Sequence, residues 1–119
     1  MNLKKIWNQF LDKYTKSPAE KIDTTTFPLD ETKRYRMIFS GHVQGVGFRY
    51  ETWMLAQKLE LVGFVKNMPD ETVAAELQGP VNKILFLIDC LQSIPRIQIE
   101  NIKMDELELK QEHQFEITN

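Results

Sequence analysis

Residues 1–17 place apolar side chains at the spacing of one face of an α-helix. These positions follow the pattern i, i+3, i+4, i+7, i+8 and i+11, and they are Leu3, Ile6, Trp7, Phe10, Leu11 and Tyr14. Four lysines against one aspartate give the segment a net charge of +3, which suits an anionic membrane surface. Most such stripes are packing surfaces, so we favour docking of this helix on the domain or on a second copy of the chain. The polar stretch that follows contains Pro18 and Pro28 and predicts a linker up to residue 32.

From residue 33 onward, short alternating runs typical of strands are interspersed with stripes typical of helices. The strand-like runs cover residues 33–40, 61–67, 72–78, 96–104 and 114–117. Helical stripes begin at Phe48 and directly after Gly79-Pro80. The order is βαββαβ with one further strand, which predicts an α+β, ferredoxin-like sandwich: a mostly antiparallel sheet with both helices on one face. We therefore expect an N-terminal helix and linker over residues 1–32 and one domain over 33–119.

The two helical stripes and the last strands carry more detailed expectations. The first stripe turns Glu51 and Lys58 outward and buries Phe48, Thr52, Leu55, Ala56 and Leu59. The second stripe buries Val81, Ile84, Leu85, Ile88 and Leu91. Cys90 lies along this second helix, where we expect a small packing residue. The apolar phase slips between Ile99 and Ile102, as a β-bulge in the strand would cause.

Composition narrows the function classes. Fifteen Lys and Arg against 17 Asp and Glu give a net charge of −2, which offers no overall positive field to attract nucleic acid. A single cysteine and two histidines supply neither an internal disulfide nor a Cys/His set for structural zinc. No run of about 18 apolar residues and no continuous hydrophobic N-terminal stretch is present. These features predict a cytoplasmic protein.

The clearest chemical signal is a cluster of three glycines in the segment Gly41-His42-Val43-Gln44-Gly45-Val46-Gly47-Phe48-Arg49. This segment connects a predicted strand to a predicted helix. Glycines permit positive φ angles, so successive N–H groups can converge on one anion next to the helix N-terminus. The alternative is a tight turn that needs only flexible residues.

Arg49 favours the anion site over the simple turn. A cation in the first turn of a helix faces the positive end of the helix dipole, which is unfavourable by about 0.3–1 kcal/mol unless an anion lies between them. The planar guanidinium can also donate to two oxygens of one phosphate. The alternative is a surface ion pair of Arg49 with Glu51 or Asp70.

The residues around this loop restrict the chemistry that a bound phosphate could undergo. A phosphate ester expels an alkoxide and needs an acid or a metal, whereas an acyl phosphate expels a carboxylate with a pKa of about 4, which leaves unaided. Such a reaction requires only a positioned water and charge stabilisation. A neutral amide can orient that water without repelling the phosphate, and Asn67 at the end of a predicted strand is the candidate.

The sequences GHVQGVGFR (41–49), GFVKN (63–67) and Thr72-Val73 resemble the acylphosphatase family, and the similarity extends over about residues 33–119. The resemblance implies that Arg49 and the loop backbone hold the phosphate, that Asn67 orients the attacking water, and that neither a cofactor nor a metal takes part. The loop residues implied in substrate binding are Gln44, Gly45, Val46, Gly47, Phe48 and Arg49.

Three positions depart from the usual pattern of this family. Phe64 stands where tryptophan is usual, and His42, which we expect on the loop surface, stands where a basic residue is common. Glu71 replaces the usual glycine of an Asp-Gly turn, so we expect a longer or slightly strained hairpin turn.

The resemblance implies an enzyme that hydrolyses a small-molecule acyl phosphate. We expect it to act free-standing, as a monomer or weak dimer. The alternative function is a non-catalytic module that binds phosphate or an acyl phosphate and acts through its N-terminal helix. Intact Arg49 and Asn67 favour the enzyme, because a module that only binds its ligand does not need an amide to orient water.

Overall fold

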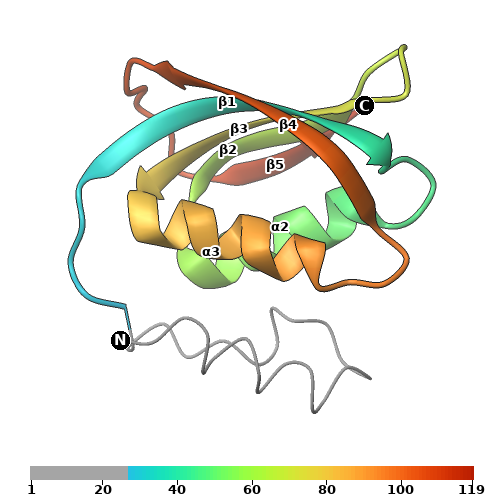
Figure 1. Cartoon of the computed structure of the whole chain (residues 1–119). Coiled ribbons are helices and arrows are strands. Elements are labelled where there is room, and N and C mark those ends of the chain that lie inside the picture. Colours follow the sequence, from blue (N-terminus) through green and yellow to red (C-terminus); the bar gives the residue numbers. More distant parts are fainter. Residues whose placement is uncertain (1–26) are drawn as a thin grey trace.

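A computed structural model describes residues 27–119, which form one sheet and two helices (Figure 1). The elements are β1 (Thr32–His42), α2 (Phe48–Leu59), β2 (Val62–Asn67), β3 (Val73–Pro80), α3 (Val81–Gln92), β4 (Gln98–Leu107) and β5 (Phe115–Thr118). Each strand and helix predicted from residue 33 onward is present, within a few residues of its expected bounds. The predicted helix over residues 1–17 and most of the linker lie outside the described residues.

The five strands have the order β4-β1-β3-β2-β5. All neighbours are antiparallel except β2 and β5, which run parallel. Both helices cover the same face of the sheet (Figure 1). The predicted ferredoxin-like α+β sandwich, with an additional C-terminal strand, is therefore confirmed.

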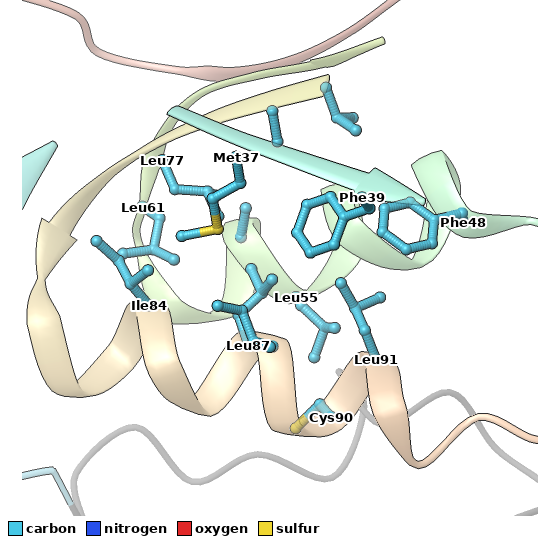
Figure 2. Close-up of a cluster of buried hydrophobic side chains, with 14 of the residues drawn as sticks. Met37, Phe39, Phe48, Leu55, Leu61, Leu77, Ile84, Leu87, Cys90 and Leu91 are labelled. Carbon is cyan, nitrogen blue, oxygen red and sulfur yellow. The ribbon is translucent and has the colours of Figure 1, made fainter. Parts of the chain in front are cut away.

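The core fills the space between the sheet and the two helices (Figure 2). Strand β1 contributes Met37 and Phe39 in the expected alternation, and the Phe39 ring lies 5.0 Å from that of Phe48 at the start of α2. This contact fixes the end of β1 against the start of α2, on either side of the glycine loop. Cys90 is buried on α3, as expected, and burial raises the pKa of its thiol, which therefore stays protonated.

The predicted bulge lies in β4. Ser40 pairs with Asn101 and Gly41 with Ile99, so Glu100 is the extra residue. A side chain at position 41 would collide with the strand, because its Cβ would lie 2.2 Å from the carbonyl oxygen of Gln98. Glycine is thus required where β1 leaves the sheet and enters the loop.

Two expectations about helix faces were wrong. Glu51 was expected to face outward, but it is only 6% exposed because its carboxylate pairs with Arg96. Leu85 was expected in the buried stripe of α3, but it is 45% exposed, while its neighbours Phe86 and Leu87 are buried. The stripe of α3 is wider than the sequence pattern suggested, and its centre is rotated away from Leu85.

The other face of the sheet contains a buried arginine that the alternation did not reveal. Arg34 is 0% exposed and pairs with Glu76 on β3 and with Glu112 in the segment after β4. Lys110 of the same segment also contacts Glu76. This ion-pair network holds the segment between β4 and β5 against the sheet, which helps to place the C-terminal strand.

The residues just before β1 also contact the domain. The Asp30 carboxylate accepts a hydrogen bond from the backbone N–H of Asn82 in the first turn of α3, at 2.9 Å. The Phe27 ring lies edge-on to Phe86, 5.1 Å between centroids. Contacts with the domain thus begin before residue 33, and the expected division at 32/33 stays a prediction. None of the helices in residues 27–119 has the length and apolar character needed to cross a membrane.

Candidate active site

A small pocket lies where the loop after β1, the start of α2 and the ends of β2 and β5 meet. Its volume is about 220 Å³, below the roughly 300–1,000 Å³ of pockets that enclose drug-sized ligands. A small anion with a short substituent therefore suits it better than a large ligand. The pocket is lined by Val43, Gly45, Gly47, Phe48, Arg49, Tyr50, Asn67 and Ile117.

The loop backbone shows the features expected of an anion site. Gly45 and Gly47 both adopt positive φ angles, of 74° and 80°. Gly47 is also the N-cap of α2, and no side chain caps this helix end. The first N–H groups of a helix have no partner within the helix, so at this end they are available to a ligand, and the helix dipole favours a negative one.

Arg49 lies in the first turn of α2 and points a donor toward the last strand. Its Nη1 donates a hydrogen bond to the carbonyl oxygen of Thr118 at 3.0 Å. The alternative pairing with Glu51 or Asp70 is not formed: Glu51 pairs with Arg96, and Asp70 accepts hydrogen bonds from Thr72. Within residues 27–119 no ion pair involves Arg49. The remaining guanidinium donors are therefore available to an anion in the pocket.

Asn67 ends β2 and faces the same pocket as Arg49. Its backbone is fixed by pairing with Val73 across the hairpin. No hydrogen bond formed within the described part of the chain uses its carboxamide. The amide can therefore accept from a water and donate to another oxygen, which is what orientation of a nucleophilic water requires.

The side chain of Gln44 connects the loop to the hairpin. Its Nε2 donates to the carbonyl oxygens of Met68 and Thr72, both at 2.8 Å. These two carbonyls lie on either side of the turn that follows Asn67. Gln44 was expected among the loop residues that bind phosphate, yet it does not line the pocket; its side chain instead fixes the distance between the loop and Asn67.

The hairpin turn itself shows the strain expected from its sequence. Glu71 adopts a φ of 71°, a conformation that glycine favours and other residues rarely adopt. Asp70 stabilises the turn by accepting hydrogen bonds from the hydroxyl and the N–H of Thr72, and these bonds lower its pKa. The strain is confined to the far side of the turn, since Asn67 stays in regular register with β3.

Four further residues around the site were missed by the sequence analysis. Tyr50 and Ile117 line the mouth of the pocket, and Thr118 supplies the acceptor for Arg49. Arg96 donates from Nε to the carbonyl oxygen of Val46 at 2.7 Å and pairs with Glu51 at 2.6 Å. The periodicity of apolar residues cannot reveal the contacts of Arg49 with Thr118 and of Arg96 with Val46, because each joins residues 50 or more positions apart. Val46, like Gln44, was expected to bind phosphate but does not line the pocket.

The described residues offer no obvious metal site. Across residues 27–119, no group of three or more His, Cys, Asp and Glu side chains is arranged to hold a metal ion. The polar groups at the pocket are a guanidinium, a carboxamide and backbone amides, which are donors for an anion.

A split βαβ sandwich in which an uncapped helix end, a glycine loop and an arginine meet at one pocket defines an α+β domain with a candidate anion site. Residues 35–117 match the family model for acylphosphatase. The chain belongs to the acylphosphatase family, and the predicted family is thus confirmed. The enzyme class is confirmed with it, a hydrolase acting on acyl phosphates.

Individual relatives agree with this assignment. An acylphosphatase of Acaryochloris marina is 40% identical over 83 residues, which make up 69% of this chain and 89% of that protein. The crystal structure of acylphosphatase from Bacillus subtilis superimposes with a TM-score of 0.69 at 35% identity and covers 75% of this chain and 100% of that one. An acylphosphatase structure from Coxiella burnetii has a TM-score of 0.67 at 27% identity and covers 73% of this chain and 93% of that one.

Proposed function

We propose that this protein hydrolyses small-molecule acyl phosphates to a carboxylate and inorganic phosphate by in-line attack of water. The observation that carries the proposal is that Arg49 and Asn67, 18 positions apart in the sequence, line one small pocket together with two glycines of the loop. The arginine and the loop hold the phosphoryl group, and the amide orients the attacking water. The substrate-binding segment runs from Gln44 to Arg49, with Gln44 and Val46 acting through the loop conformation.

The electrostatics of the pocket support phosphate binding. The N-terminus of α2 contributes a partial positive charge, and Arg49 adds a full one. The repulsion between these two positive charges is offset when an anion lies between them. Because these groups are fixed by the fold before the substrate arrives, they stabilise the charge of the transferring phosphoryl group without reorganisation. In this proposal these groups lower the barrier, and neither a metal nor a cofactor takes part.

The leaving group explains why no strong acid is needed. A carboxylate has a pKa of about 4 and departs without prior protonation at neutral pH. The remaining requirement is a water opposite the P–O bond that breaks. Asn67 can accept a hydrogen bond from that water, and its amide is neutral, so it adds no repulsion to the phosphate oxygens. The proton that the water gives up ends on an oxygen of the released phosphate. The position of Asn67 on β2 is held by pairing with Val73 in β3.

We propose that the protein acts in the cytoplasm as a monomer or weak dimer and has no nucleic-acid partner. The net charge of −2 and the single buried cysteine support these assignments. Binding of residues 1–17 to a membrane surface is the less favoured alternative to their docking on protein.

Hydrolysis of benzoyl phosphate by the full-length chain tests this proposal. We expect turnover in the wild type, near-complete loss in Arg49→Gln, and a kcat lowered about 100-fold or more in Asn67→Ala, the scale of losing one positioned polar group. Arg36→Gln and Asn101→Ala, both at exposed positions of the sheet, serve as matched controls and should keep full activity. Phosphate binding without any turnover in the wild type would instead favour the non-catalytic binding module.

A further inference from the structure

We propose that Arg96 is a positioning residue that sets the conformation of the phosphate loop, an inference that rests on the proposed function. Arg96 lies just before β4 and reaches across to the loop after β1. Its Nε donates to the carbonyl oxygen of Val46 at 2.7 Å, and its Nη2 pairs with Glu51 at 2.6 Å. One guanidinium thus joins the loop and the first turn of α2.

The contact with Val46 determines where the next N–H group points. The carbonyl of Val46 and the N–H of Gly47 belong to one planar trans peptide, so they point in opposite directions. With the carbonyl held by Arg96, the N–H of Gly47 is directed away from Arg96. Gly47 lines the pocket, whereas Val46 and Arg96 do not. Arg96 therefore turns the Gly47 N–H toward the phosphate site.

The contact of Arg96 with Glu51 offsets a negative charge that would oppose phosphate binding. Glu51 lies in the first turn of α2, the helix end that meets the pocket, and is nearly buried. An uncompensated carboxylate at this position would repel a phosphate held by the same helix end. The ion pair with Arg96 neutralises that charge. The guanidinium of Arg96 is held in one orientation, because it contacts Val46 and Glu51 at the same time.

Gly47 is small enough for Arg96 to approach. A Cβ at this position would lie 3.3 Å from Nη2 of Arg96, closer than most contacts of this kind, and 3.5 Å from its Nε, an ordinary contact distance. The positive φ of 80° also favours glycine here. Glycine at position 47 therefore suits both the positive φ of the turn and the close packing of Arg96.

Arg96 is accessible enough to be replaced without disrupting the core. Its side chain is 53% exposed, and it lies outside the hydrophobic cluster. Lysine is an informative substitution, since its single ammonium lacks the planar fork that serves Val46 and Glu51 together. Arg36→Gln, which removes an exposed arginine on β1 elsewhere in the domain, is the matched control.

The test combines inorganic phosphate binding with turnover of benzoyl phosphate, using the full chain. We expect Arg96→Ala to weaken phosphate binding about tenfold and to raise KM, with Arg96→Lys intermediate and Arg36→Gln unchanged. In ¹⁵N–¹H spectra, the Gly47 amide should shift strongly on phosphate addition in the wild type and only weakly in Arg96→Ala. A role limited to stability would lower the unfolding midpoint and leave this shift and the affinity of the folded protein intact.

The outcomes separate the two proposals. Wild-type affinity and an unchanged Gly47 shift in Arg96→Ala, or in Arg96→Lys if the alanine variant does not fold, would overturn the role of Arg96. A wild type that neither binds phosphate nor hydrolyses benzoyl phosphate would instead overturn the proposed function.

Discussion

The guanidinium of Arg49 and the main-chain carbonyl of Thr118 are joined by a hydrogen bond of 3.0 Å. This contact links the first turn of α2 to the last strand of the domain. Strand β5 lies parallel to β2, with Thr118 beside Lys66, the residue before Asn67. The C-terminal strand therefore places the arginine relative to the amide, although the two belong to different parts of the chain.

Removal of the last two residues tests this relationship. Deleting Thr118 and Asn119 takes away the acceptor of Arg49, so the guanidinium loses one of its orienting contacts. We expect kcat/KM for benzoyl phosphate to fall about tenfold, the scale of one hydrogen bond to a charged group. Thr118→Ala keeps the carbonyl and should retain activity. Equal activity in all of these chains would show that Thr118 does not orient Arg49.

Gln44 offers a second test, because its side chain joins the loop to the hairpin. Gln44→Leu removes both hydrogen bonds to the carbonyls of Met68 and Thr72. We expect kcat to fall by about tenfold through a less defined distance between Asn67 and the phosphate. Gln92→Leu, on the exposed end of α3, is a control for the same substitution. The idea fails if steady-state kinetics of Gln44→Leu match those of the control.

Glu71 carries a strain that glycine would relieve. Glu71→Gly should raise the free energy of unfolding by about 0.5–1 kcal/mol, since relief of the positive φ exceeds the added flexibility of the unfolded chain. Glu71→Ala keeps the strained backbone and should leave stability nearly unchanged. Urea denaturation measures both variants. A glycine variant no more stable than the alanine variant would contradict the assignment of strain.

Glu76 should make stability depend on pH. Burial alone would raise its pKa, but hydrogen bonds from Arg34 and Lys110 outweigh burial and lower it below the ordinary value of 4.5. The stabilisation is therefore complete above about pH 5 and is lost as the pH falls through the lowered pKa in the folded protein. We expect the wild type to exceed Glu76→Gln by about 2 kcal/mol near pH 7. The difference should shrink below pH 4.5.

Urea unfolding of the two chains over a pH series measures this difference. Lys103→Met removes an exposed charge from β4 of the same sheet and controls for a general effect of net charge. A gap that stays constant down to about pH 3 would show that the Glu76 pKa is not lowered on folding.

Local patterns predicted the order of elements. The joint role of Arg49 and Asn67, 18 positions apart, rested on chemical reasoning and on the family resemblance, and it stays a prediction. The slip between Ile99 and Ile102 predicted a bulge in this stretch, because a bulge shifts which residues face the core, and the structure has it at Glu100. The glycine loop was visible because positive φ angles require a specific residue type. The order of elements, the bulge and the glycine loop are each encoded by residues close together in the sequence, which is why the sequence alone reveals them.

The features that were missed depend on contacts between distant segments. Glu51 resembled an outward-facing helix residue because its ion pair with Arg96, which lies just before β4, cannot be inferred from the helix pattern. Arg34 sits in a strand that alternates normally, and its burial depends on Glu76 and on the segment after β4. The partner of Arg49 is a backbone carbonyl, and every residue has one, so the sequence does not indicate which residue supplies it.

Calorimetric titration of inorganic phosphate into the wild type, Arg49→Gln and Asn67→Ala tests the division of roles between these two residues most directly. We predict a clear binding isotherm for the wild type, an affinity lowered about 100-fold or more in Arg49→Gln, and nearly unchanged affinity in Asn67→Ala despite its lost turnover. Unchanged phosphate affinity in Arg49→Gln, or full turnover in Asn67→Ala, would contradict the account.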